Sequence, residues 1–100
     1  MKGRKDKAKM GATAAIKIKI MPEGLDTNLD EIKAGVKKNI ESEGGVVNNF
    51  EEEPIAFGLK ALIVTFAWPE EKDTEIAEAL VKKVAGVSNV DIIDYRRAIG

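Results

Sequence analysis

The side chains that could carry out chemistry here are carboxylates, lysines, arginines and hydroxyls, because the 100-residue chain has no cysteine and no histidine. It therefore lacks the thiolate nucleophile, the commonest general base and the usual zinc ligands. Without cysteine there is no disulfide, and nothing points to an oxidising compartment. We expect no cofactor, no metal and no covalent catalysis, so the residues of interest are those suited to binding.

Two pairs of acidic residues are the remaining candidates for acid–base work or for magnesium binding. They are Glu70 with Glu71, and Asp26 with Asp30. Each pair is predicted to lie at a helix start, where the helix dipole favours negative charge. We therefore interpret both pairs as helix-start residues and assign them no chemistry.

The most unusual binding candidate is the stretch EEEPIAFGLKAL, residues 51–62. Pro54 fixes the direction of the backbone and Gly58 allows another chain to approach closely, so PIAFG suits a rigid mount for Phe57 as an aromatic anchor. Strand alternation carried back from the following segment places Phe57 with Leu59, on the side away from the core. The alternative interpretation is that Phe57 packs onto the core at a strand start.

Hydrophobic periodicity divides the chain into six elements. Ile16, Ile18 and Ile20 alternate with lysines, as in a strand with one solvent-facing side. Leu29, Ile32, Val36 and Ile40 recur at helical spacing, after Asp26, Thr27 or Asn28 as a cap and before Gly44 and Gly45 as a stop. The predicted elements are a strand over 13–22, a helix over 28–42, strands over 45–53 and 59–68, a helix over 73–86 and a strand over 87–99.

Two of these elements have a predicted buried side. In the strand over 59–68 the even positions are bulkier than the odd ones, so we assign Leu62, Val64 and Phe66 to the core. The second helix is capped by Asp73 or Thr74 and closed by Gly86. Its apolar positions are Ile76, Ala79, Leu80, Val81 and Val84.

The order β-α-β-β-α-β predicts a ferredoxin-like α+β sandwich. Two split β-α-β units with right-handed crossovers place both helices on one face of a four-stranded antiparallel sheet. The other face is left uncovered, and such surfaces often bind partners. The fold alone does not select the partner.

The charge distribution separates a short arm from the rest of the chain. Residues 1–9 carry five basic residues and one acid, whereas residues 10–100 hold 11 basic and 16 acidic residues. We expect a disordered, dispensable basic arm over 1–9 and one domain over 10–100. No apolar run approaches the roughly 20 residues of a membrane span, and the N-terminus has no signal-like apolar stretch, so we expect a cytoplasmic protein without a membrane partner.

Other functions on this fold have less support in the sequence. An RNA-binding module needs several exposed rings on a basic sheet, but only Lys17 and Lys19 favour it and the body is acidic, so we expect no direct nucleic-acid partner apart from an open question about the arm. A phosphatase of this topology would carry an arginine in the loop MPEGLDTN, which has no basic residue. A small-molecule sensor that pairs through its sheet stays open as an alternative.

Three stretches together resemble a known family. EEEPIAFGLKAL, IKIKIMPEG and VSNVDIIDYRR are similar to the archaeal form of translation elongation factor one-beta, over essentially residues 10–100. The resemblance implies a guanine-nucleotide exchange factor, a non-covalent catalyst, whose partner is the GDP-bound GTPase elongation factor one-alpha. The most specific part is PIAFGLKAL, because the eukaryotic exchange domains carry a very similar IAFG before a strand.

The resemblance also implies which residues bind the partner. The aromatic residue of IAFG inserts into a pocket of the GTPase, which corresponds to Phe57 flanked by Ile55, Ala56 and Gly58. A basic residue near the C-terminus reaches the magnesium and phosphate site, which corresponds to Arg97 or alternatively Arg96. The family has a lysine there, and arginine is not an equivalent of it. The two arginines could instead only pair with Asp91 or Asp94.

The acidic run Glu51, Glu52 and Glu53 has two interpretations. It could steer the protein toward a basic patch on the GTPase. It could also prevent a strand edge from pairing with neighbouring molecules, which we favour.

Overall fold

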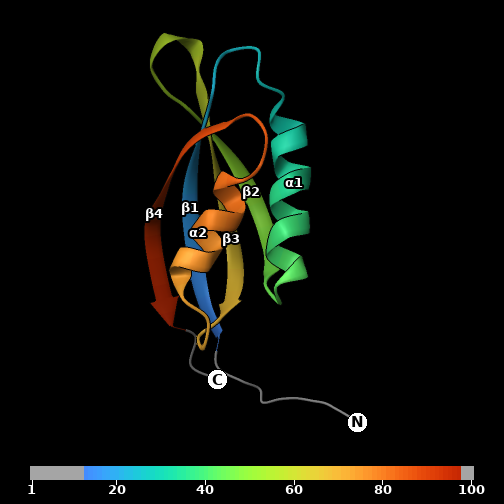
Figure 1. The fold of residues 1–100 in the computed structure, drawn as a ribbon. Helices are drawn as coiled ribbons and strands as arrows, with labels where there is room; N and C mark the ends of the chain where they lie inside the picture. Colours follow the sequence, from blue (N-terminus) through green and yellow to red (C-terminus); the bar gives the residue numbers. More distant parts are fainter. Residues whose placement is uncertain (1–12, 98–100) are drawn as a thin grey trace.

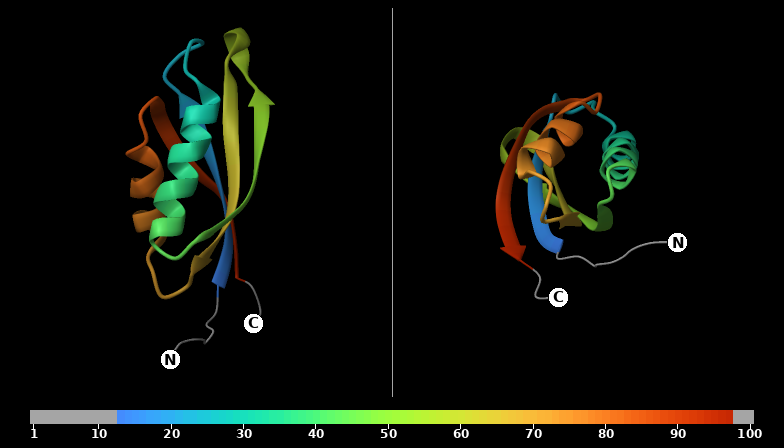
Figure 2. Two further views of the ribbon diagram at one scale, coloured as in Figure 1. Left: turned by 90° about the vertical axis from the view of Figure 1, so that its right-hand side faces the viewer. Right: turned by 60° about the horizontal axis from the view of Figure 1, so that its bottom comes forward.

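Two helices lie on one face of a four-stranded antiparallel sheet in the computed structural model, which describes residues 13–97 (Figures 1 and 2). This arrangement confirms the predicted ferredoxin-like α+β fold. The predicted arm over 1–9 and the last three residues lie outside the described part of the chain. The elements are β1 (Thr13–Pro22), α1 (Leu29–Ser42), β2 (Val46–Pro54), a 3-10 turn (Ala56–Gly58), β3 (Lys60–Pro69), α2 (Thr74–Lys82) and β4 (Val87–Arg97).

The sheet has the order β2-β3-β1-β4, so β2 and β4 are its edges. Residues opposite one another across the strands share a face: Ile18 lies opposite Val64 on one side and Ile92 on the other. The alternating isoleucines of β1 and the even positions of β3 are buried under the helices, as predicted. Phe66 and Trp68 are the largest buried side chains and meet edge to face, with ring centroids 6.0 Å apart.

Helix α1 begins and packs as its sequence predicts. The Asn28 side chain accepts hydrogen bonds from the backbone N–H groups of Asp30 (2.9 Å) and Glu31 (3.3 Å), which satisfies two donors that have no partner within the helix. Ile32, Val36 and Ile40 are buried against the sheet.

Helix α2 is shorter than predicted, and its buried side matches the prediction only in part. It ends at Lys82, so Val84 follows the helix. Ala77 and Val81 are its buried residues, whereas Ile76 is 42% exposed and Ala79 is also exposed. Of the other predicted apolar positions, Val81 is buried and Leu80 and Val84 pack against the core, whereas the small Ala77 was not predicted and is fully buried.

The β2–β3 hairpin reaches one end of the molecule, together with the β1–α1 loop (Figures 1 and 2). Figure 1 shows its loop at the end of the molecule opposite the C-terminal end of β4. The described chain is elongated, with principal extents of 50 × 22 × 20 Å. The fold therefore has two distant ends, one formed by the hairpin tip and the β1–α1 loop, the other by the end of β4 and the β3–α2 turn.

Candidate partner-binding site

The tip of the β2–β3 hairpin is closed by two backbone hydrogen bonds. The N–H of Ile55 donates to the carbonyl oxygen of Leu59 at 2.8 Å, and the N–H of Leu59 donates to that of Ala56 at 3.2 Å. Between them the chain makes a tight 3-10 turn over Ala56–Gly58. The predicted site residues of PIAFG thus form one ordered loop.

Phe57 adopts a backbone conformation that bulky residues rarely accept. Its φ of 64° and ψ of 27° lie in the left-handed region, and Gly58 follows with φ of 78°. A non-glycine residue held there costs about 1–3 kcal/mol, so the hydrogen bonds that close the tip must hold it in place. Phe57 is the only non-glycine residue with a positive φ among residues 13–97.

The Phe57 side chain points into solvent, with 92% of the residue exposed. This contradicts the interpretation in which it packs on the core. The prediction that it continues the alternation of β3 is also wrong, because the chain turns between Ile55 and Leu59 and the strand starts only at Lys60. The ring therefore projects from the hairpin tip and does not belong to the open face of the sheet.

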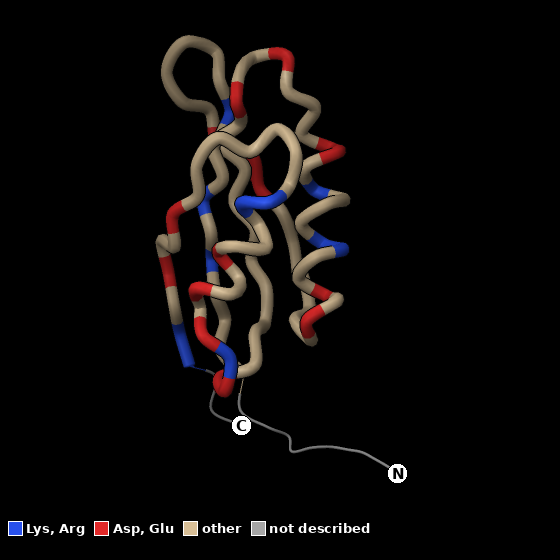
Figure 3. The backbone as a smooth tube through the Cα atoms, viewed as in Figure 1, with Lys and Arg blue, Asp and Glu red and all other residues tan. Residues whose placement is uncertain are grey.

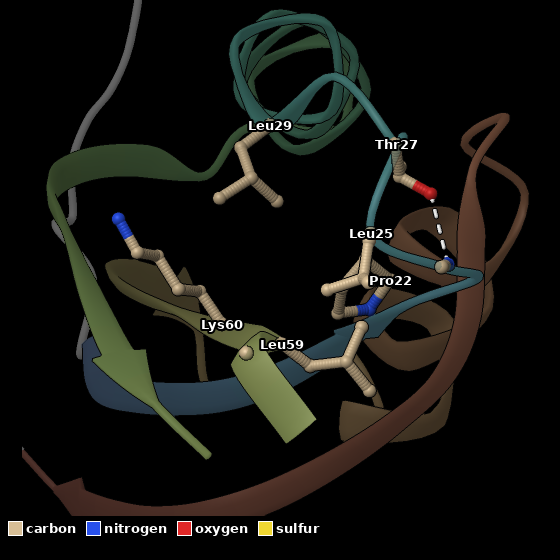
Figure 4. Close-up of a pocket in the computed structure, with 8 residues that line it drawn as sticks. Pro22, Leu25, Thr27, Leu29, Leu59 and Lys60 are labelled. Atoms are coloured by element: carbon tan, nitrogen blue, oxygen red, sulfur yellow. Dashed lines mark hydrogen bonds between the residues drawn. The ribbon is translucent and has the colours of Figure 1, made fainter. Parts of the chain in front are cut away.

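A pocket of mixed polar and apolar lining lies beside this tip, between the β1–α1 loop and the start of β3. Its volume is about 250 Å³, and it is lined by Pro22, Gly24, Leu25, Thr27, Leu29, Gly58, Leu59 and Lys60. Figure 4 shows Leu25, Leu29 and Leu59 directed toward a shared space. Leu25 is 69% exposed, and sequence reasoning missed it, although an isolated leucine in the polar loop MPEGLDTN was a visible signal.

The C-terminal arginines lie at the other end of the molecule. Both side chains are largely exposed: Arg96 Nε is 3.2 Å from an oxygen of Asp94, one of the predicted partners, and Arg97 Nε is 3.5 Å from Glu70 Oε1. Glu70 lies in the turn after β3 and not at the start of α2, so its helix-start interpretation is wrong. In Figure 3 the basic residues of β4 (blue) lie far from the uncharged hairpin tip (tan). The structure does not bring Phe57 and the arginines together.

The acidic run on β2 is largely engaged with lysines of the same chain. Glu52 lies 3.4 Å from Lys33 of α1 and 3.7 Å from Lys60 of β3, and Glu53 lies 3.2 Å from Lys19 of β1. Because β2 is an edge strand, these charges support the interpretation that they protect an edge from pairing.

The open face of the sheet lacks the features of a nucleic-acid platform. Lys17 and Lys19 lie opposite Asp94 and Asp91 of β4. The aromatic residues of the described strands instead align with core-facing positions: Phe50 lies opposite Val64 and Tyr95 opposite Ile16. This face therefore offers neither stacked rings nor an uncompensated positive charge.

Residues 13–97 offer no candidate for two other kinds of site. No three acidic side chains there gather closely enough to hold a metal ion. No helix in that range has the length and apolar composition needed to cross a membrane.

Comparison with known proteins gives one consistent result. The profile of the EF-1 guanine nucleotide exchange domain matches residues 15–98. Elongation factor 1-beta of Methanosarcina barkeri is 52% identical over 89 residues, which cover 88% of this chain and 99% of that protein. The Methanosarcina acetivorans protein of the same name is 49% identical over 89 residues, again 88% of this chain and 99% of that protein. That of Methanothermobacter thermautotrophicus is 41% identical over 81 residues, or 80% of this chain and 90% of that protein.

Proposed function

Because this chain belongs to the family of EF-1 guanine nucleotide exchange domains, we propose that it accelerates GDP release from elongation factor one-alpha by inserting Phe57 into an apolar pocket of the GTPase. The observation that carries this proposal is the 92% exposure of a phenylalanine held in a left-handed conformation. A protruding ring contributes nothing to the core, but it supplies a pre-oriented contact for a partner.

The C-terminal arginines are proposed to act at a separate place on the GTPase. Because they lie at the far end of the molecule from Phe57, the partner must be contacted at two regions. One region receives the ring and anchors the complex. At the other, Arg97 or Arg96 approaches the magnesium and phosphate site, where a GTPase holds GDP with P-loop backbone groups, a lysine and magnesium.

Release of GDP then follows from linkage between the two ligands of the GTPase. A partner that distorts the phosphate site weakens GDP binding, and GDP weakens partner binding by the same factor. GTP enters the vacated site and drives the exchange factor off. No covalent step is needed, so this protein acts as a non-covalent catalyst on the GDP-bound form, in the cytoplasm.

Arginine in place of the family's lysine affects how the C-terminal contact works. A guanidinium is a planar fork suited to bidentate contact with phosphate oxygens, whereas an ammonium is a compact point charge that can occupy a cation's position. We therefore propose that Arg97 or Arg96 contacts phosphate and does not substitute for magnesium. Glu70 and Asp94 hold these arginines only through exposed, weak ion pairs, which an anionic site can replace.

The test is release of a fluorescent GDP analogue from purified archaeal elongation factor one-alpha, with this protein added below stoichiometric amounts. Wild type should accelerate release over many turnovers. Phe57→Ala should lose most of the acceleration, and Arg97→Ala and Arg96→Ala should show which arginine acts on the nucleotide site.

Circular dichroism and thermal unfolding of each variant provide the control for folding. Absence of acceleration by folded wild type would overturn the proposal and leave ligand and RNA screens as the next step. Full activity of folded Phe57→Ala would reject only the aromatic anchor.

A further inference from the structure

We infer that the β1–α1 loop and the adjoining pocket form a second contact for the GTPase, which receives an apolar side chain of the partner flanked by a basic residue. This inference rests on the proposed function, because it extends the contact surface that begins at Phe57. It assigns a binding role to Leu25 and to the acidic residues next to it.

Exposure of large apolar side chains is greatest at this end of the molecule. Phe57 at 92% and Leu25 at 69% are the two most exposed large hydrophobic residues among those described. They come from different elements, yet Leu25 Cδ2 lies 3.5 Å from where a Cβ on Gly58 would stand, so the loop touches the hairpin tip. Two large exposed apolar residues on adjoining loops are a feature typical of a protein contact.

The β1–α1 loop, which forms one wall of the pocket, is held by hydrogen bonds within the chain. In the β1–α1 loop the Thr27 N–H donates to the Gly24 carbonyl at 3.2 Å, and the Gly24 N–H donates to Thr27 Oγ1 at 3.0 Å. The Glu23 N–H donates to the Gly86 carbonyl at 2.9 Å, which ties the loop to the turn before β4. The loop is thus held in a defined shape, and a pocket of about 250 Å³ can receive one aliphatic or aromatic side chain.

The charge around the pocket indicates which residue of the partner should lie next to the apolar side chain that the pocket receives. Glu23 and Asp26 of the loop are exposed, and Asp30 and Glu31 follow in the first turn of α1; Figure 3 shows acidic residues (red) along this path. Lys60 is the only cation that lines the pocket, and its Nζ already lies 3.7 Å from Glu52 Oε1. The four acids flank the pocket without lining it, and Asp30 is paired with Lys33 at 3.8 Å, so Glu23 and Asp26 of the loop are the charges that complement a lysine or arginine on the partner.

The experiment measures the concentration of this protein that gives half-maximal acceleration of GDP release. Leu25→Ala should raise it about five- to tenfold, the loss expected for one well-buried aliphatic contact. Glu23→Gln with Asp26→Asn should raise it about threefold at low salt and reduce its dependence on salt concentration. A role limited to supporting the hairpin would not change the salt dependence.

Ile76→Ala is the matched control, because Ile76 is an exposed aliphatic residue on α2, which lies away from the hairpin end; its value should equal that of wild type. If the Leu25 and acid variants are folded and match wild type while Phe57→Ala is inactive, the second contact is rejected and the exchange function stands. If wild type itself gives no acceleration, the proposed function fails and this inference fails with it.

Discussion

At the scale of single residues, Phe57 and Gly58 place an aromatic ring where it cannot stabilise the domain. Phe57 has a positive φ and is 92% exposed, so it costs backbone free energy without gaining burial. Residues of this kind occur where a partner supplies the missing contacts. Stability and activity should therefore respond separately to substitutions at the hairpin tip.

Phe57→Ala should leave the free energy of unfolding within about 0.5 kcal/mol of wild type, because the ring packs against almost nothing. The control is Phe66→Ala, which removes a fully buried ring and should cost about 3–5 kcal/mol. Urea unfolding monitored by circular dichroism measures both. If Phe57→Ala lost as much unfolding free energy as Phe66→Ala, the ring of Phe57 would have to be packed on the core.

Gly58→Ala should lower stability by about 1 kcal/mol and reduce exchange, because φ of 78° disfavours any residue with a Cβ. The space itself is open, since the nearest atom to an added Cβ would be Leu25 Cδ2 at 3.5 Å. The stability of Gly58→Asn should lie between those of wild type and Gly58→Ala, because asparagine tolerates the left-handed region better than alanine does. Equal stability of all three in thermal unfolding would show that the tip relaxes.

At the scale of elements, the connection between α1 and β2 is closely packed. Gly45 is buried, and a Cβ added there would stand 2.5 Å from Ile40 Cγ2, 3.0 Å from Trp68 Cε3 and 3.1 Å from the Ala67 carbonyl oxygen. Lys72 ties the same corner, since its Nζ contacts both the carbonyl and the carboxylate of Glu43 and lies 5.7 Å from the centre of the Trp68 ring.

Gly45→Ala should therefore lower the free energy of unfolding by about 1–3 kcal/mol through overpacking. Gly24→Ala is the control, because nothing lies within 4 Å of an added Cβ at that position, and its stability should stay near wild type. Unfolding in guanidinium chloride measures the stability of both variants. Since the corner lies away from the hairpin tip, the folded fraction of Gly45→Ala should keep its specific exchange activity.

At the scale of the whole molecule, the two predicted contacts lie at opposite ends of an elongated fold. Sites this far apart, with no shared neighbours, make independent contributions. In the proposed function, the domain anchors on the GTPase at one end and perturbs the nucleotide site at the other. This division of work can be measured by combining substitutions from the two ends.

The effects of Phe57→Ala and Arg97→Ala on the apparent second-order rate constant of exchange should add, within about 0.5 kcal/mol, in the double variant. Phe57→Ala should act mainly on the half-maximal concentration and Arg97→Ala mainly on the maximal rate. Stopped-flow release of labelled GDP resolves both quantities. A double variant no worse than either single one would mean that the two ends act as one unit.

The sequence by itself determined the elements, the fold and the family, because each depends on local patterns. Alternating isoleucines on β1 and helical spacing on α1 depend on residues near one another in the chain, and the structure confirms both. Three neighbouring residues were candidates for the cap of α1, and the structure selects Asn28. The motif PIAFG singled out Phe57 for the same reason. The apolar side of α2 was predicted only in part: Val81 is buried as expected, but packing against the sheet selected Ala77 over the larger Ile76.

Only the tertiary structure decided where the site residues lie. Strand alternation predicted that Phe57 lies on the open face of the sheet. In the structure the chain makes a turn there to close the hairpin, so the ring lies at the tip. Glu70 and Arg97 form an ion pair, and Leu25 contacts the hairpin tip, although in each case the partners are far apart in sequence. The separation of the hairpin tip from the arginines of β4 likewise involves distant segments of the chain (Figure 3). Such relations depend on how the strands pair and the loops meet, and no local spacing of residues encodes them.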